Sequence, residues 1–297
     1  MPQLVWLVTG CTSGLGEELV YAILARGDRV IATGRNAVIR LSHLKDSGAA
    51  VLDIDVTASQ AVLNIKIEEA LAVYGRIDVL VPNAGYSEIG FVEELRQEKW
   101  QDQLQTNFFG VTNITRAILP HFRKRKVGHI AIISSVLAWS GALAAGPYAV
   151  SKHAIDGYGK TLQQEVAQFG IRTVIFNIGY IRTKLTSTPK VSVPEDDEYR
   201  SIFERFLEAS ATIPGNEPGD PKKCAERIVD VMKGEGMASG KPMPSQVPLG
   251  SDVLATVKET CEAMLKTCEE WKDLIKSTDF EGPKQGFWAE NTVRTSW

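Results

Sequence analysis

The sequence predicts a doubly wound α/β fold, a parallel sheet with helices on both of its faces, followed by a C-terminal helical extension. Short apolar runs alternate with longer segments of helical periodicity through the first 180 residues. A glycine-rich turn joins the first apolar run to the first helical segment. Beyond residue 250, apolar residues recur at a helical period from Val253 to Ile275, which predicts one long amphipathic helix.

The elements follow one another in the order that such a fold requires. Leu4–Val8 reads as a strand buried on both faces, glycines follow it, and helical spacing runs from Leu19 to Leu24. Further strands are expected at residues 30–33, 51–54, 77–81, 129–133 and 172–176, with helices at 60–74, 98–126 and 148–169. Because helices separate the strands, the sheet is expected to be parallel and covered on both faces.

The chain changes character after Thr183. Segments rich in Pro and acidic residues (189–197) and in Pro and Gly (212–221) flank a helical pattern at 199–209. This arrangement is typical of a lid over a site, and an incidental surface excursion is the alternative. We expect one catalytic domain over residues 1–250, with a lid region at 184–221. The extension over 251–297 is expected to pack on the core, with a partner helix as the alternative, and its aromatic tail from Thr278 is expected to dock.

Composition excludes several classes of protein. The 297 residues carry 33 Lys+Arg and 36 Asp+Glu without a sustained basic stretch, which excludes a nucleic-acid partner. The run Arg123–Lys126 closes a predicted helix and is expected to be solvated. No apolar stretch is long enough to cross a membrane, and the four cysteines do not form a disulfide framework. The four histidines show no metal-binding spacing, so we expect a reduced, cytoplasmic protein without a metal.

The turn from Thr9 to Gly16 predicts a dinucleotide site. Glycines at these positions let the backbone turn sharply and approach a pyrophosphate at the positive end of the following helix. An NAD site usually has a carboxylate at the end of the second strand, but here that strand ends in Thr33-Gly34-Arg35. Because a guanidinium suits a 2′-phosphate, Arg35 favours NADP(H) over NAD.

Tyr148 and Lys152 form the strongest candidate for acid–base chemistry. Four residues apart on a predicted helix, they share one face, so the phenol and the ammonium can act at one site. A phenol works as an acid–base group near pH 7 only where a neighbouring cation lowers its pKa. Ser135 ends a buried strand upstream, at the sheet edge where such folds bind ligands.

These motifs together resemble the short-chain dehydrogenase/reductase (SDR) family, over residues 1–185 and more loosely to residue 250. Pro82 and Ile178 stand where that family usually has asparagine and proline, which affects loop geometry near the nicotinamide rather than the catalytic groups. The matching residues are the glycine loop, Asp55, Asn83, Ala84, Gly85, Asn107, Ser135, Tyr148 and Lys152.

The resemblance implies a Rossmann-type fold and a role for each matching residue. Tyr148 would be the general acid/base, and Lys152 would lower its pKa and bind the nicotinamide ribose. Ser135 would orient the substrate oxygen, and Asn107 would hold a water that connects Lys152 to solvent. Beside Tyr148 and Lys152, the expected cofactor contacts are Gly10, Thr12, Ser13, Gly14, Leu15, Gly16, Arg35, Asp55, Val56, Asn83, Ala84, Gly85, Ile181 and Thr183.

The expected activity is that of an NADP(H)-dependent oxidoreductase acting on a lipophilic ketone or secondary alcohol, with reduction as the favoured direction. Non-redox chemistry on the same scaffold (a cyclase, epimerase or dehydratase) and a non-catalytic NADP-binding sensor are the alternatives. The resemblance also implies assembly as a homodimer through the helices at 98–126 and 148–169, which is favoured over a monomer shielded by the extension. The residues expected to border the substrate are Val136, Leu137, Ala138, Leu143, Tyr180, Phe203 and Phe206.

Overall fold

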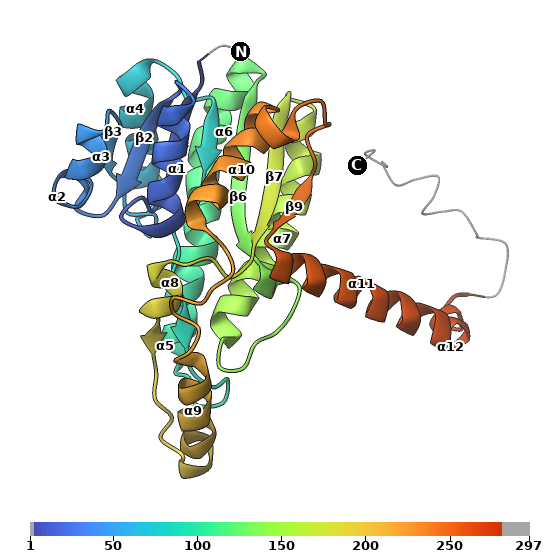
Figure 1. The fold of residues 1–297 in the computed structure, drawn as a ribbon. Coiled ribbons are helices and arrows are strands. Elements are labelled where there is room, and N and C mark those ends of the chain that lie inside the picture. The colour runs from blue at the N-terminus through green and yellow to red at the C-terminus, as the bar shows by residue number, and fades with distance from the viewer. Residues whose placement is uncertain (1–2, 281–297) are drawn as a thin grey trace.

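The computed structural model describes residues 3–280 and contains the expected parallel sheet. Its strand order, β3-β2-β1-β4-β6-β7-β9, is that of a doubly wound fold, and every pair in it is parallel (Figure 1). The strands are β1 (Val5–Val8), β2 (Arg29–Gly34), β3 (Ala50–Asp53), β4 (Val79–Val81), β6 (Gly128–Ser135), β7 (Ile171–Ile178) and β9 (Gln246–Leu249).

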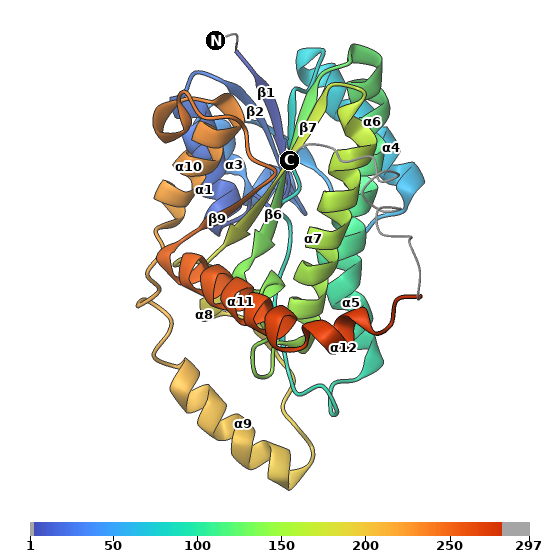
Figure 2. The same ribbon diagram turned by 90° about the vertical axis from the view of Figure 1, so that its right-hand side faces the viewer.

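Helices cover both faces of the sheet (Figure 2). Along β1, Trp6 and Val8 face one helical layer while Val5 and Leu7 face the other, which explains why the strand is apolar throughout. The first layer holds α1 (Gly14–Ala25), α2 (Ala37–Arg40), α3 (Ser42–Asp46) and α10 (Pro221–Lys233). The second holds α4 (Gln60–Tyr74), α6 (Gly110–Arg125) and α7 (Gly146–Ala167).

The basic end of α6 is not simply solvated, and the expectation for it is wrong at Arg125. Its guanidinium donates to Asp78 Oδ1 at 2.7 Å and to the Ile77 carbonyl at 2.6 Å. Asp78 also accepts from the Val5 N–H and from Arg76. Burial pushes the Asp78 pKa up, but these donors outweigh it and hold the pKa below its usual range. The carboxylate therefore ties α6 to the beginnings of β1 and β4.

The predicted lid helix is present as α9 (Asp197–Ser210), apart from the sheet in both ribbon views (Figures 1 and 2). Asp196 caps it by accepting from the N–H groups of Glu198 and Tyr199. Phe203 is only 1% exposed and packs against Phe91, with ring centroids 5.7 Å apart. The shorter elements α5 (Gln97–Leu104) and α8 (Lys184–Ser187) and a two-stranded sheet of β5 (Glu88–Ile89) and β8 (Lys190–Val191) complete the fold outside the main sheet.

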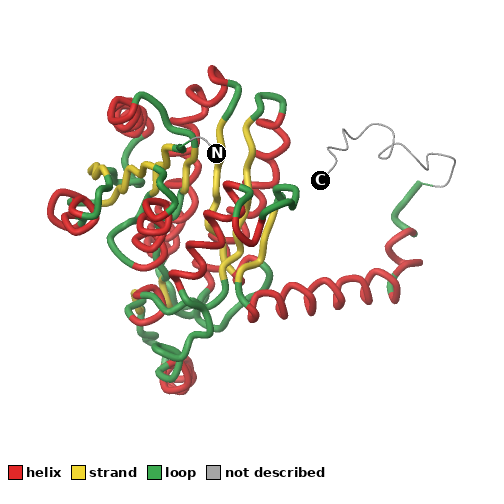
Figure 3. Tube along the Cα trace, turned by 45° about the horizontal axis from the view of Figure 1, so that its top comes forward, coloured by secondary structure: helices red, strands yellow, loops and turns green. Residues whose placement is uncertain are grey.

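The C-terminal extension forms the expected long helix, α11 (Ser251–Glu270), followed by α12 (Lys272–Lys276). The expectation that it packs on the core is wrong for most of its described length. Val253 is buried beside Leu137 and Tyr148, but Leu265 is 69% exposed. After its first turns the helix projects away from the body, so no element within residues 3–280 lies under its apolar face (Figures 1 and 3).

The expected docking of the aromatic tail is wrong at Phe280, which is fully exposed. Phe287, Trp288 and Trp297 lie outside the described residues. Across residues 3–280, no helix is both long and apolar enough to cross a membrane.

Candidate active site

A cleft of about 960 Å³ opens at the carboxyl edge of the sheet, where doubly wound folds bind their ligands. All the catalytic and cofactor-binding residues expected from the sequence line this cleft, except Asn107. They come from the loops after β1, β2, β3, β4 and β7, from the end of β6 and from α7. One cavity therefore contains both the dinucleotide motif and the acid–base residues.

The glycine loop leaves room for a ligand by holding its own backbone against the loop after β4. Gly10 has φ +72°, and a Cβ at this position would lie 2.7 Å from the Ala84 Cα, so only glycine fits. Asn83 donates through Nδ2 to the Thr9 carbonyl at 2.9 Å, and the N–H groups of Asn83 and Ala84 donate to Thr9 Oγ1. Ser13 precedes α1 without a side-chain cap, so the first N–H groups of the helix remain available to an anion.

Two arginines line the far end of the cleft. Arg35 follows directly after β2, and Arg40 lies at the end of α2; both side chains are exposed. Arg40 was missed by sequence reasoning, because only the fold of α2 brings it to the same wall as Arg35. Asp55 turns one carboxylate oxygen back to the N–H and hydroxyl of Thr57. The resulting end of the cleft carries two guanidinium groups suited to a phosphate.

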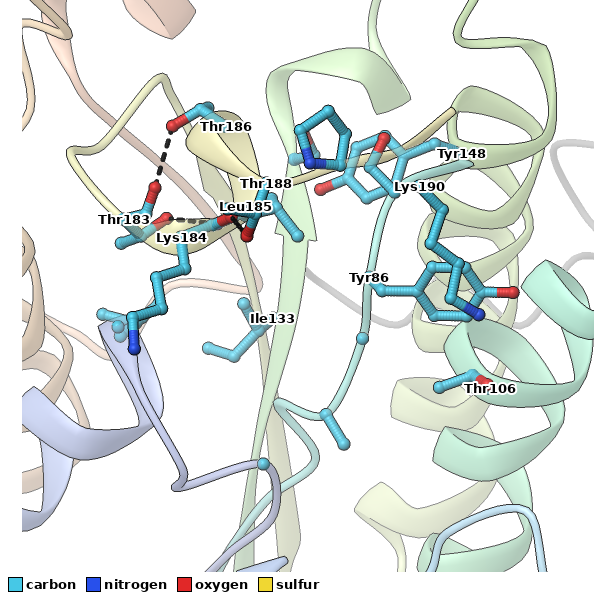
Figure 4. A pocket seen from close by; sticks show the side chains of 18 of the residues that line it. Tyr86, Thr106, Ile133, Tyr148, Thr183, Lys184, Leu185, Thr186, Thr188 and Lys190 are labelled. Atoms are coloured by element: carbon cyan, nitrogen blue, oxygen red, sulfur yellow. Dashed lines mark hydrogen bonds between the residues drawn. The ribbon is translucent and has the colours of Figure 1, made fainter. Parts of the chain in front are cut away.

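Tyr148 and Lys152 lie one turn apart on α7, facing the end of β6. The Lys152 ammonium donates to the Ile133 carbonyl at 2.9 Å and lies 5.6 Å from the centroid of the Tyr148 ring. The Ser135 hydroxyl hydrogen-bonds the Tyr148 phenol and accepts from the Leu137 N–H at 3.2 Å. Figure 4 shows the phenol pointing into the cleft. A carbonyl oxygen placed here can contact both hydroxyl groups.

Burial dominates the protonation of this pair. Burial raises the pKa of Tyr148 to about 12, although the hydrogen bond with Ser135 opposes the shift. Burial also lowers the pKa of Lys152 to about 8, with the nearby Asp156 carboxylate opposing it. The ammonium is bonded to a carbonyl rather than to the phenol, so desolvation dominates at Tyr148. Near neutral pH the phenol is protonated, and Lys152 is the group of the pair that titrates closer to pH 7.

Asn107 lies behind the cleft rather than in its wall. It belongs to a π-helical turn, Gln105–Phe109, between α5 and α6, and is 1% exposed. Its Oδ1 accepts from the Tyr86 N–H at 3.1 Å, while Nδ2 donates to the Tyr86 carbonyl at 3.0 Å and to Ser151 Oγ at 3.2 Å. Asn107 thus joins the loop after β4 to α7 beside the catalytic pair.

Asp156, missed by sequence reasoning, lies one further turn along α7 from Lys152. It accepts hydrogen bonds from Ser134 Oγ at 2.5 Å, Asn177 Nδ2 at 3.0 Å and Gln246 Nε2 at 2.8 Å. Burial raises the pKa of this carboxyl, and the bonds from Ser134 and Asn177 oppose that shift. The amide nitrogens of Asn177 and Gln246 can only donate, and the Ser134 hydroxyl donates as well, which matches an ionised carboxylate. The regular spacing of Tyr148, Lys152 and Asp156 was a signal that could have identified it.

The outer half of the cleft is mainly apolar. Tyr180 lines it as expected, but Ala138 and Phe203 do not. Phe203 instead belongs to the small core formed with Phe91 and Ala144. Lys190 and Tyr86 were not anticipated; the Lys190 ammonium lies 4.0 Å from the Tyr86 ring centroid (Figure 4). The apolar lining consists of Ile89, Val136, Leu137, Ala142, Leu143, Leu185, Val191, Phe206, Leu207 and Ile213.

The two departures from the family pattern leave the strand ends intact. Ile178 continues the ladder of β7, opposite Ser135 on β6 and Leu249 on β9. Pro82 is buried between β4 and Asn83.

Cys11, in the glycine loop, is a small buried side chain of the core. Its thiol donates to the Val8 carbonyl, and burial raises its pKa to about 12.

Comparison with known proteins gives a consistent result. The family described as short chain dehydrogenase matches residues 4–191. Oxidoreductase BOA17 of Botryotinia fuckeliana is 30% identical over 91% of this chain and 97% of its own length. A short-chain dehydrogenase from Streptomyces avermitilis superposes with a TM-score of 0.82 at 30% identity, over 94% of this chain and all of that one. A single-residue variant of actinorhodin polyketide ketoreductase, solved with NADPH, gives a TM-score of 0.70 at 28% identity, over 84% of this chain and 97% of that one.

Proposed function

The chain belongs to the short-chain dehydrogenase/reductase family, and we propose that it is an NADP(H)-dependent reductase of lipophilic ketones. The observation that carries this proposal is the shared cleft: Ser135, Tyr148 and Lys152 face the same cavity as the glycine loop and Arg35. A binding protein that only sensed the cofactor would have no need for a buried phenol beside a buried ammonium.

The residues present fit a nicotinamide dinucleotide with a 2′-phosphate. The tight Gly10 turn and the uncapped start of α1 suit the pyrophosphate, and Thr183 packs against Gly14, which brings the loop after β7 to the same place. Arg35 and Arg40 suit the 2′-phosphate, and neither forms an ion pair within residues 3–280. The similar actinorhodin ketoreductase was solved with NADPH, which supports this choice.

The mechanism follows from the protonation states. When bound, the nicotinamide supplies the hydride. Ser135 holds the substrate oxygen through its hydroxyl, and Tyr148 donates its proton to that oxygen as negative charge develops on it. Lys152 stabilises the resulting phenolate because its ammonium is held within reach of the Tyr148 ring. A phenol protonated near neutral pH is in the form that reduction requires, so this state favours reduction over oxidation.

The outer cleft supports a lipophilic substrate. Its apolar walls from β5, β8 and the lid helix would exclude water from the reacting carbonyl. The similar actinorhodin enzyme acts on a polyketide, as its name states. Lys190 and Tyr86, with Ser87, Thr186 and Thr188, add polar groups to this surface, so the substrate is expected to combine an apolar body with a few polar groups.

The test is NADPH oxidation across a panel of lipophilic ketones and aldehydes, followed by the nicotinamide absorbance, with NADH in parallel. Tyr148→Phe should bind NADPH normally and lose a factor of about 100 to 10,000 in turnover. Tyr158→Phe is the matched control, because Tyr158 is on the same helix but does not line the cleft. Tyr148→Phe with wild-type turnover would refute the mechanism, and equal use of NADH would refute the cofactor assignment.

A further inference from the structure

A second cavity, of about 710 Å³, extends from the beginnings of β6 and β7 along β9 at the edge of the sheet. His129 and Arg172, near the beginnings of β6 and β7, line this cavity, whereas the ends of the same strands reach the cleft. Leu249, at the carboxyl end of β9, also lines the second cavity and lies next to Gly179 of the cleft, but the two cavities share no lining residue. The second cavity is therefore distinct from the site proposed for the cofactor and substrate.

The walls of this cavity are largely apolar and adaptable. Met232, Met237 and Met243 line it, three of the five methionines in the chain. Methionine is unbranched and polarisable, so a surface rich in it adjusts to flexible apolar chains. The remaining apolar lining comes from Leu4, Val231, Pro242, Pro244, Val247 and Leu249.

Positive charge remains available at the edge of this apolar surface. Asp230 is the only carboxylate among the described residues that line it, and it is already bonded to Arg26 at 2.6 Å and to Arg227 at 2.9 Å. By contrast, Arg172 and Lys241 are exposed and form no ion pair with any residue from 3 to 280. His129 contributes a buried Nδ1 without a hydrogen-bond partner in the same range.

We propose that this cavity binds an amphipathic monoanion, a medium-chain carboxylate whose chain lies among the methionines and whose head group is held by Arg172 and Lys241. The volume falls within the range of about 300 to 1,000 Å³ typical of small-molecule sites. A neutral lipid would leave both cations unused, and an acidic ligand without a chain would leave the apolar walls uncovered. The carboxylate accepts charge-assisted hydrogen bonds from both side chains.

Methionine methyl resonances provide a direct test. The full chain, labelled with [¹³C-methyl]methionine, is titrated with decanoate below its micellar concentration and, separately, with 1-decanol. Decanoate should shift the signals of Met232, Met237 and Met243 saturably, and leave Met264, on the exposed part of α11, in place. None of these methionines lines the active-site cleft, so binding there does not mimic the result.

Charge variants test the head-group site. Arg172→Gln/Lys241→Gln should weaken decanoate binding about 100-fold, the value of two charge-assisted hydrogen bonds, without changing the affinity for decanol. Lys258→Gln/Lys266→Gln removes the same charge from α11 and should have no effect. Unmoved methionine signals, equal affinity for decanoate in both double variants, or signals that shift with protein concentration as a dimer forms would each overturn the proposal.

Discussion

Replacing Asp156 with Asn should move the alkaline limit of the reductase activity to lower pH. Residues four apart on a helix have their Cβ atoms about 5–6 Å apart, and two unit charges at about 6 Å interact by about 3 kcal/mol at an effective dielectric constant of about 20. That energy equals about two pKa units. The hydrogen bonds that Asp156 accepts spread its charge, so we expect the Lys152 pKa to fall by about one to two units.

The sign follows from the charge states. The carboxylate favours the ammonium, so removing it lets Lys152 lose its proton at lower pH. In the wild type, kcat/KM for ketone reduction should decline above a pH of about 8, where Lys152 deprotonates. In Asp156→Asn this decline should begin about one to two units lower. The two proteins should therefore have similar activity near pH 5.5 and differ about tenfold at pH 8.

The assay is the pH profile of kcat/KM, with the ketone varied at saturating NADPH, and the Tm of each variant as a check on folding. Ser134→Ala is the control, because it removes one hydrogen bond to Asp156 but leaves the charge in place. Its alkaline limb should coincide with that of the wild type. A uniform loss of activity in Asp156→Asn at every pH, with no displacement of the limb, would show that the carboxylate acts only through packing.

Four further substitutions test separate parts of the structure. Arg35→Asp should reduce kcat/KM for NADPH by about 10- to 100-fold and raise the relative use of NADH, measured by initial rates with each cofactor. Gly10→Ala should abolish NADPH binding, measured by fluorescence titration, and also lower the Tm, because the new Cβ would clash with the Ala84 backbone at a φ that strains alanine. Phe203→Ala should expose the segment around α9 to limited proteolysis and raise the KM for the ketone, leaving NADPH affinity unchanged. Asp78→Asn should lower the stability at pH 7 by about 2 kcal/mol, with a loss that shrinks as the pH falls through the depressed pKa of the wild-type carboxyl; denaturation curves at several pH values measure both.

Local signals were sufficient for most of the sheet and for placing Tyr148 and Lys152 in the cleft. Strands buried on both faces are mostly apolar, so β1 was visible as an uninterrupted apolar run and β6 and β7 as apolar stretches within longer strands. Strand β9 was missed because Pro248 and the surrounding glycines resemble a loop, although proline is tolerated on an edge strand such as this one. The start of α10 was also missed, although Asp220 followed by Pro221 is a typical N-cap and first residue of a helix.

Interactions between distant segments could not be predicted in this way. Arg125 was expected in solvent because its neighbours in the sequence are basic, yet its partner Asp78 lies 47 residues earlier. Lys190 meets Tyr86 only because β5 and β8, far apart in the sequence, pair with each other. Both contacts depend on how the elements pack against one another. The sequence around Arg125 or Lys190 contains no signal that identifies the partner.

The packing of the C-terminal extension could not be predicted from the sequence either. A helical period reports that one face of a helix is apolar, but it does not say what covers that face. In α11 the period is regular from Val253 onward, yet only the first turns reach the body, where Val253 and Val257 pack near Tyr148. This contact supports Tyr148, the proposed proton donor, from outside the cleft. We therefore expect that charge introduced at Val253 would impair turnover as well as stability, whereas charge at Leu265 would affect neither.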